Sequence, residues 1–159
     1  MFIRDMFEQK KVVYSFELFP PKPTSPIDTL YGALDELKEL SPDYISITYG
    51  TGADMGEGTL NLCRLIKQKY GIEPLSHLTC IHTDKQSILK YLKELEKSGI
   101  ENILALRGDI KPGLLLSEDF RYASELIEFI GQHGNFGISA ACYPEGHFEA
   151  PDIVTDLKN

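Results

Sequence analysis

Short apolar runs alternate along the chain with longer stretches in which apolar residues recur every three or four positions. The short runs are typical of buried strands, and the longer periodic stretches are typical of amphipathic helices. Strands are predicted at residues 11–18, 44–48, 73–79, 103–106 and 137–141. Helices are predicted at residues 3–10, 59–70, 84–98 and 120–132, with two more that begin at Ser25 and near Asp152.

Residues typical of helix ends stand at several of these boundaries. Ser25 is predicted to cap the amino end of its helix, with Pro26 in the first helical position. Gly71 and Gly99 follow two predicted helices and are expected to adopt the left-handed conformation that ends many helices. The element boundaries are therefore marked independently of the apolar pattern.

The predicted order, in which strands recur about every 30 residues with helices between them, is typical of a parallel sheet with right-handed crossovers. A complete (β/α)₈ barrel takes about 250 residues, whereas this chain has 159. The sequence predicts one α/β domain over residues 1–159, either an open sheet or the first part of a TIM-type barrel with about five of its eight strands. The open edge of a partial barrel would favour a homo-oligomer or association with another chain.

The composition is that of an ordinary globular protein, with 42% hydrophobic and 25% charged residues. A net charge of −8 argues against nucleic acid or an anionic membrane as the main partner. No apolar run approaches the roughly 20 residues of a membrane span, and the charged start of the chain is unlike a signal peptide. Cys63, Cys80 and Cys142 lack the spacing of a zinc site or a disulfide framework. A reducing cytoplasm is the expected location.

Polar residues stand at or just after the end of every predicted strand. The carboxyl ends of parallel strands share one edge of a sheet, and ligands bind there. The clearest case is the apolar run 103–106, which ends abruptly in Arg107, Gly108 and Asp109. The residues predicted to converge at this edge are Glu17, Thr48, Tyr49, His77, Arg107, Gly108, Asp109, Tyr143 and His147.

Each ionisable candidate has a functional and a structural interpretation. Glu17 has apolar neighbours in the sequence, and an apolar setting favours a general acid, although a strand glutamate can also simply face solvent. Asp109 fits a general base or a substrate anchor, or else an ion-pair partner of Arg107. His77 fits a cofactor contact, a metal ligand or a buried core histidine, whereas His82 and His133 are predicted at the surface.

Aromatic and glycine-rich stretches add two further interpretations. Tyr49, Tyr122 and Tyr143 could stack on a flat cofactor, but Tyr122 also fits the buried face of its predicted helix. The glycine-rich stretch 49–58 lacks the lysine and hydroxyl of a phosphate-binding P-loop, so a flexible loop is predicted instead.

Five motifs, taken together and in order, resemble the methylenetetrahydrofolate reductase family. They are SFELFPP at residues 15–21, ITYG at 47–50, HLTC at 77–80, LALRGD at 104–109 and ACYPEGH at 141–147. The resemblance implies a (β/α)₈ barrel that holds FAD without a covalent bond. It also implies that a nicotinamide cofactor, NADH or NADPH, reduces FAD, which then reduces methylenetetrahydrofolate to methyltetrahydrofolate.

The resemblance also implies roles for individual residues. Glu17 would be the general acid that assists opening of the five-membered ring of the folate substrate. Asp109 would contact the pterin and place negative charge near the flavin, and Thr48 would lie near the nicotinamide. The residues that would line the FAD are Tyr49, His77, Arg107, Gly108, Tyr122, Ala123, Tyr143, His147, Ala150, Asp156 and Asn159.

Members of the family continue for three more strands, so this chain is expected to be an N-terminal portion that alone binds FAD weakly and turns over poorly. Two other interpretations remain open at this point. One is a metal-dependent lyase or hydrolase with Glu17, His77, Asp109 and His147 as ligands. The other is a non-catalytic fragment that only binds or associates.

Overall fold

Five parallel strands form one sheet in the computed structural model, which describes residues 1–21, 27–50 and 56–158. Each strand pairs with the strand before it in the chain, in parallel and in order. This arrangement confirms the predicted parallel (β/α) fold of the TIM-barrel type. The strands are β1 (Ser15–Leu18), β2 (Tyr44–Ile47), β3 (Glu73–Thr79), β4 (Asn102–Leu106) and β5 (Gly137–Ala140).

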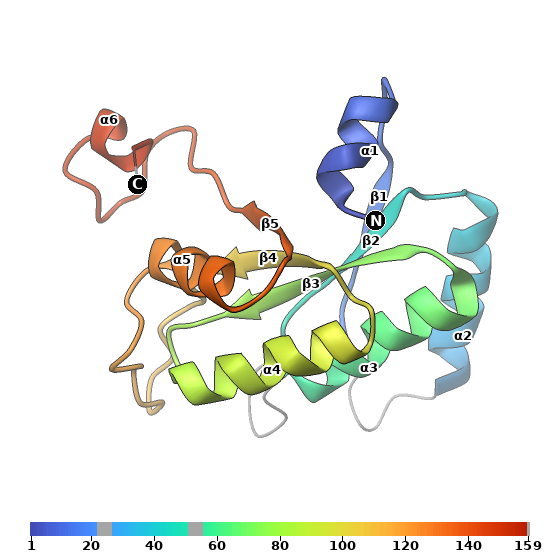
Figure 1. The fold of residues 1–159 in the computed structure, drawn as a ribbon, viewed down its shortest axis with the longest axis horizontal. Helices are drawn as coiled ribbons and strands as arrows, with labels where there is room; N and C mark the ends of the chain where they lie inside the picture. Colours follow the sequence, from blue (N-terminus) through green and yellow to red (C-terminus); the bar gives the residue numbers. More distant parts are fainter. Residues whose placement is uncertain (22–26, 51–55, 159) are drawn as a thin grey trace.

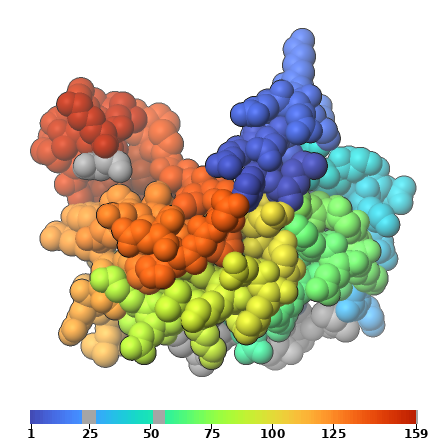
Figure 2. All heavy atoms as spheres, viewed as in Figure 1, coloured from blue at the N-terminus to red at the C-terminus, as the bar shows by residue number. Residues whose placement is uncertain are grey.

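Helices cover the two faces of the sheet unequally. Figure 1 shows α2, α3 and α4 on one side of the sheet and α1 on the opposite side. Figure 2 shows the N-terminal segment and the segment after β5 as two separate projections with a hollow between them. The helices are α1 (Ile3–Gln9), α2 (Ile27–Glu39), α3 (Glu57–Leu65), the π-helical turn η1 (Ile66–Tyr70), α4 (Lys85–Lys97), α5 (Ala123–His133) and α6 (Ile153–Asp156).

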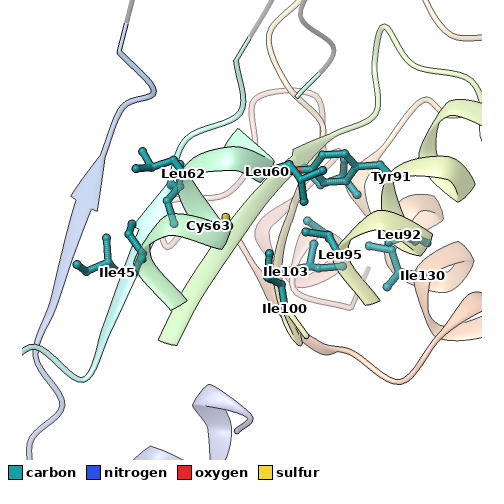
Figure 3. Packing of buried hydrophobic residues seen from close by; sticks show 14 of the residues in the cluster. Ile45, Leu60, Leu62, Cys63, Tyr91, Leu92, Leu95, Ile100, Ile103 and Ile130 are labelled. Atoms are coloured by element: carbon teal, nitrogen blue, oxygen red, sulfur yellow. The ribbon is translucent and has the colours of Figure 1, made fainter. Parts of the chain in front are cut away.

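The main hydrophobic core lies between the sheet and the helices α2 to α5. Side chains alternate between the two faces of a strand, and the core-facing set includes Ile45 and Ile103, both fully buried. Leu92 and Leu95 of α4 and Ile130 of α5 complete this layer (Figure 3). Burial of such side chains contributes about 1.5–3 kcal/mol each, so this layer fixes the positions of the strand ends.

The opposite face of the sheet, called the inner face below, is closed at the amino ends of the strands by α1. Ile3 and Met6 of α1 pack against Leu75 of β3. Asn102, which is 1% exposed, accepts a hydrogen bond at Oδ1 from the Ile3 amide (2.9 Å). Its Nδ2 donates to the Met1 carbonyl (2.9 Å), so one buried amide anchors the start of α1 to β4.

Most predicted boundaries agree with the structure, and the largest difference is at β1. The strand begins at Ser15 rather than residue 11, because β2, its neighbour in the described sheet, begins at Tyr44, the partner of Ser15. Just before β1, the Tyr14 amide donates to the Asp43 carboxylate instead of continuing the ladder (2.8 Å). Gly71 has the predicted left-handed conformation.

Two helix predictions have different outcomes. Tyr122 was predicted on a buried helix face, and this is wrong: α5 begins at Ala123, and Tyr122 precedes it in extended conformation with 37% of its surface exposed. The predicted caps Ser25 and Pro26 lie outside the described residues. Among the described residues, no helix is long and apolar enough to cross a membrane.

Candidate active site at the carboxyl ends of the strands

Glu17, Ser46 and His77 come together on the inner face, from three neighbouring strands. The register pairs Glu17 with Ser46, and Ser46 with Leu75, two residues before His77, which places all three on one face. The Ser46 hydroxyl donates to Glu17 Oε2 at 3.4 Å. His77 Nε2 lies 3.6 Å from the same oxygen, so hydroxyl and imidazole flank one carboxylate.

The setting of Glu17 differs from the prediction. Its side chain is 52% exposed, whereas the sequence suggested an apolar environment. Phe16 and Leu18 turn to the other face, where they pack against the core, because successive side chains of a strand point in opposite directions. The apolar setting is therefore wrong, and the polar neighbours Ser46 and His77 define the surroundings of this carboxylate.

His77 is a buried histidine with an unpartnered ring nitrogen. The residue is 6% exposed, and Nε2 has no hydrogen-bond partner among the described residues. Burial lowers the pKa of His77, and the nearby Glu17 carboxylate opposes that shift only in part. The ring is therefore neutral at pH 7, and its buried Nε2 faces the Glu17 carboxylate without a hydrogen bond.

The lowered pKa of His77 predicts a pH-dependent stability. The unfolded chain binds this proton more readily than the folded one, so stability falls as pH drops through the unfolded histidine pKa of about 6.5. His77→Asn is expected to reduce the difference in unfolding free energy between pH 7.5 and pH 5.5, measured by urea denaturation. His133→Asn, at an exposed histidine of α5, should leave the difference unchanged. An equal pH dependence in wild type and His77→Asn would contradict the prediction.

Arg107 lies at the carboxyl end of β4 and forms an ion pair that the sequence did not predict. Its Nη1 donates to Glu149 Oε1 at 2.7 Å, and the two side chains are 19% and 31% exposed. This hydrogen bond lowers the pKa of the Glu149 carboxyl. The only sequence signal for Glu149 was its charge, which many acidic residues share. A groove of about 610 Å³ lies beside the pair and is lined also by Phe120 and Arg121.

Four of the predicted FAD-lining residues gather in the segment after β5. Tyr143 packs edge-on against His147, with ring centroids 4.8 Å apart. The His147 amide donates to Asp156 Oδ2 (2.8 Å), and the Ala150 amide donates to the His147 carbonyl (2.9 Å). Because Glu149 belongs to the same segment, its ion pair with Arg107 joins this cluster to the end of β4.

The other predicted site residues are more dispersed. Thr48 follows β2 directly, and its carbonyl accepts from the Thr59 hydroxyl (2.8 Å). Tyr49 turns toward the helix layer and packs edge-on against Tyr91 (5.7 Å). Ala123 opens α5 beside the exposed Tyr122. Asn159 and residues 51–55 of the glycine-rich stretch 49–58 lie outside the described residues.

Asp109 is exposed at the rim of the site, directly after Gly108. Gly108 has φ +85°, and a Cβ there would lie 3.0 Å from Thr79 Cβ and 3.3 Å from Ile81 Cγ2. A left-handed conformation and a close approach to β3 both require glycine at this position. The turn that presents Asp109 is therefore fixed by its contact with the end of β3.

Gly108→Ala is expected to destabilise the protein by about 2–3 kcal/mol, because it adds steric contact to the strain of positive φ. Gly113→Ala is a matched control: its φ is +83° and its new Cβ would meet nothing within 4 Å. We expect that variant to lose only about 1 kcal/mol. Urea denaturation measures both changes, and equal losses would show that contact with Thr79 has no cost.

The proposed metal ligands do not assemble. Within the described residues, no group of three or more histidine, cysteine, aspartate or glutamate side chains is placed to hold a metal ion. Glu17 and His77 are neighbours, but His147 belongs to the separate cluster after β5. The metal-centre interpretation therefore has no ligand set in the part of the chain that is described.

A comparison with solved structures supports the fold. The 4-hydroxy-tetrahydrodipicolinate synthase of Methylacidiphilum fumariolicum SolV superposes with a TM-score of 0.55 at 18% sequence identity. The match covers 85% of this chain and 45% of that protein. At this identity the likeness concerns the arrangement of strands and helices alone.

Sequence comparisons place the chain in a family. The family model described as methylenetetrahydrofolate reductase matches residues 2–159. The 5,10-methylenetetrahydrofolate reductases of Pectobacterium carotovorum and Escherichia coli are 35% and 36% identical over 95% of this chain. The alignments cover 50% of each, so the chain spans about half the length of these relatives. Methylenetetrahydrofolate reductase (NADH) 1 of Arabidopsis thaliana is 33% identical over 96% of the chain and 26% of its own length. The chain therefore belongs to the methylenetetrahydrofolate reductase family.

Proposed function

We propose that this protein reduces 5,10-methylenetetrahydrofolate to 5-methyltetrahydrofolate, with FAD as its bound cofactor and NAD(P)H as the hydride donor. Residues 1–159 would be the N-terminal part of a (β/α)₈ FAD-binding barrel. Family membership over the whole chain supports the reaction, and the parallel order of strands supports the barrel. The single observation that carries the proposal is the Glu17 carboxylate on the inner face, flanked by Ser46 and His77.

The residues present fit a flavin in their chemistry. His77 offers a buried, unpartnered ring nitrogen, and Arg107 offers a guanidinium at the end of β4. FAD, when bound, would supply the ring that accepts and donates hydride, while the protein supplies binding and orientation. The residues proposed to hold it are Tyr49, His77, Arg107, Gly108, Tyr122, Ala123, Tyr143, His147, Ala150, Asp156 and Asn159, with Thr48 near the nicotinamide.

Glu17 would act as the general acid. Its exposure lets a bound folate reach the carboxyl group, and the Ser46 hydroxyl lies within hydrogen-bond distance of Oε2. A proton passed from the carboxyl group to a ring nitrogen of the substrate would assist opening of the five-membered ring.

Asp109 would contact the pterin ring and place a negative charge near the flavin. The side chain is exposed at the rim, and the fixed turn at Gly108 defines its position. Arg107, two residues before it, pairs with Glu149 rather than with Asp109. The negative charge of Asp109 would then face the ligand.

Association with further protein is part of the proposal. β1 and β5 each pair with one strand only in the described sheet, and such edges favour pairing with additional strands. We propose that the rest of the barrel, or a second copy of the chain, covers them. We also propose a cytoplasmic location, and the net charge of −8 argues against nucleic acid or an anionic membrane as the main partner.

A flavin-retention experiment tests the proposal. The full-length protein is mixed with FAD, desalted and examined by visible absorption, with retained bands expected at roughly 380 and 450 nm. NAD(P)H should bleach these bands, and methylenetetrahydrofolate should restore them. The isolated 159-residue chain is expected to retain little flavin and to turn over poorly. A folded full-length protein that retains no flavin would overturn the proposal. A bound flavin that NAD(P)H reduces but methylenetetrahydrofolate does not reoxidise would overturn the assignment of the folate as substrate.

A further inference from the structure

The turn between β3 and α4 forms hydrogen bonds with the long connection that follows β4. The Ile81 amide donates to the Arg107 carbonyl (2.9 Å), and the Ser117 amide donates to the Ile81 carbonyl (2.7 Å). The Ser117 hydroxyl donates to the Thr83 carbonyl, also at 2.7 Å. Both ends of the connection between Arg107 and Ser117 are therefore fixed to residues 81–83.

His82 holds the middle of the same connection, called the 107–117 loop here. Its Nδ1 lies 2.8 Å from the Leu115 carbonyl, and its Nε2 lies 3.1 Å from the Asp109 carbonyl. The Lys111 amide also points at Nε2, at 3.3 Å. The sequence suggested a surface residue, whereas the side chain is half-buried and contacts three backbone groups of the loop.

The chemistry of imidazole assigns these contacts. A carbonyl only accepts, so Nδ1 carries hydrogen and donates to Leu115. In the neutral ring Nε2 is then an acceptor, and it accepts from the Lys111 amide. In the imidazolium Nε2 becomes a donor and bonds the Asp109 carbonyl instead, a charge-assisted and therefore stronger contact. The two contacts of Nε2 thus belong to two different protonation states.

We propose that His82 is a positioning residue that holds the backbone of Asp109, and that protonation of its ring tightens this hold. The consequence for catalysis rests on the proposed function, in which Asp109 contacts the bound pterin. The positioning itself rests only on the three backbone contacts. Protonation of the ring is therefore expected to increase the order of the loop.

The charged residues of the two segments around the ring are Asp84, Lys85, Asp109, Lys111, Glu118 and Asp119. Lys85 Nζ lies 3.6 Å from Asp119 Oδ1.

Limited proteolysis measures the order of the loop without flavin or folate. Leu115 is 92% exposed, and Leu114 and Leu116 are about half exposed, so thermolysin, which cleaves before large apolar residues, has sites there once the loop opens. Such cleavage follows the population of the opened form. In the full-length protein, His82→Ala is expected to speed cleavage at residues 114–116 by about tenfold, the effect of losing one or two net hydrogen bonds.

Two variants and two pH values make the test specific. His133→Ala, at an exposed histidine bonded only within α5 as far as the described contacts show, should leave cleavage of the loop unchanged. His82→Gln keeps a donor and an acceptor and should partly restore protection. The ratio of the His82→Ala rate to the wild-type rate should be about threefold larger below the pH at which nitrogen NMR shows the His82 ring to be protonated than above it. A wild-type rate in folded His82→Ala, or a ratio that does not change across that protonation, would overturn the proposal.

Nitrogen NMR of the histidine rings in the wild-type protein supplies a measurement that needs no variant. At pH 8 the His82 ring should carry its hydrogen on Nδ1, and an Nε2–H ring would overturn the assignment. Neither experiment involves a flavin. A protein that fails to bind flavin but shows these effects would refute the proposed function alone, whereas one that reduces folate normally without them would refute the role of His82 alone.

Discussion

Glu17→Gln is expected to lower the rate of folate reduction by about 10²–10⁴-fold, the usual contribution of a general acid, while hydride transfer from NAD(P)H to the flavin continues. Glutamine keeps the size of the side chain and can still accept from the Ser46 hydroxyl. It has no proton to give to the folate ring nitrogen. Because the side chain is 52% exposed, the substitution should have little effect on folding.

Rapid-mixing absorbance measurements on the full-length protein separate the two half-reactions. Bleaching of the flavin by NAD(P)H follows the first, and its recovery with methylenetetrahydrofolate follows the second. Glu36→Gln, at an exposed position of α2, is the matched control and should behave as wild type. A Glu17→Gln protein that reoxidises its flavin with folate at the wild-type rate would exclude Glu17 as the acid.

Asn102→Ala is expected to destabilise the protein by about 2–4 kcal/mol, because buried partners lose their hydrogen bonds. The Ile3 amide loses its acceptor, and the Met1 carbonyl and the Glu73 carboxylate lose a donor. Alanine also leaves a space at a position that is 1% exposed. The damage should be concentrated where α1 covers the amino ends of the strands.

Urea denaturation gives the loss of stability, and hydrogen exchange locates it. Amides of α1 should exchange faster in Asn102→Ala, whereas those of α4, on the other side of the sheet (Figure 1), should change only by the global loss. Asn61→Ala, at an exposed position of α3, is expected to change stability by about 0.5 kcal/mol or less. Unchanged exchange in α1 would mean that Ile3 and Met6 hold the helix by packing alone.

The order of elements could be predicted from the sequence because local signals determine it. The predicted strand at residues 73–79 matches β3 at both ends, and its five central residues are buried, as expected for a strand paired on both sides. The edge strand β1 is shorter than the predicted strand because β2, its partner in the described sheet, begins only at the residue opposite Ser15. The exposure of Tyr122 was missed for a related reason: helical periodicity does not say at which residue a helix begins.

The candidate site was predictable in its location but less so in its contacts. Parallel topology explains why Glu17 and His77 meet. The apolar environment predicted for Glu17 was wrong because its sequence neighbours, Phe16 and Leu18, lie on the opposite face of the sheet. The partners Glu149 and His82 depend on how two connections fold back, 42 residues from Arg107 and 27 from Asp109. No local sequence pattern indicates contacts over such long separations. The two connections have no periodicity from which their path could be predicted.

The anchoring of α1 by Asn102 has a consequence for the order in which the chain acquires structure during synthesis. Each strand pairs with the one made just before it, so the sheet can grow from the ribosome one βα unit at a time. The start of α1 is the exception, since its anchoring side chain is made about a hundred residues later. Contacts of such long sequence separation form slowly. We therefore expect α1, which is translated before the strands of the sheet, to stay undocked until β4 has joined the sheet, leaving Ile3 and Met6 exposed to chaperones in the meantime.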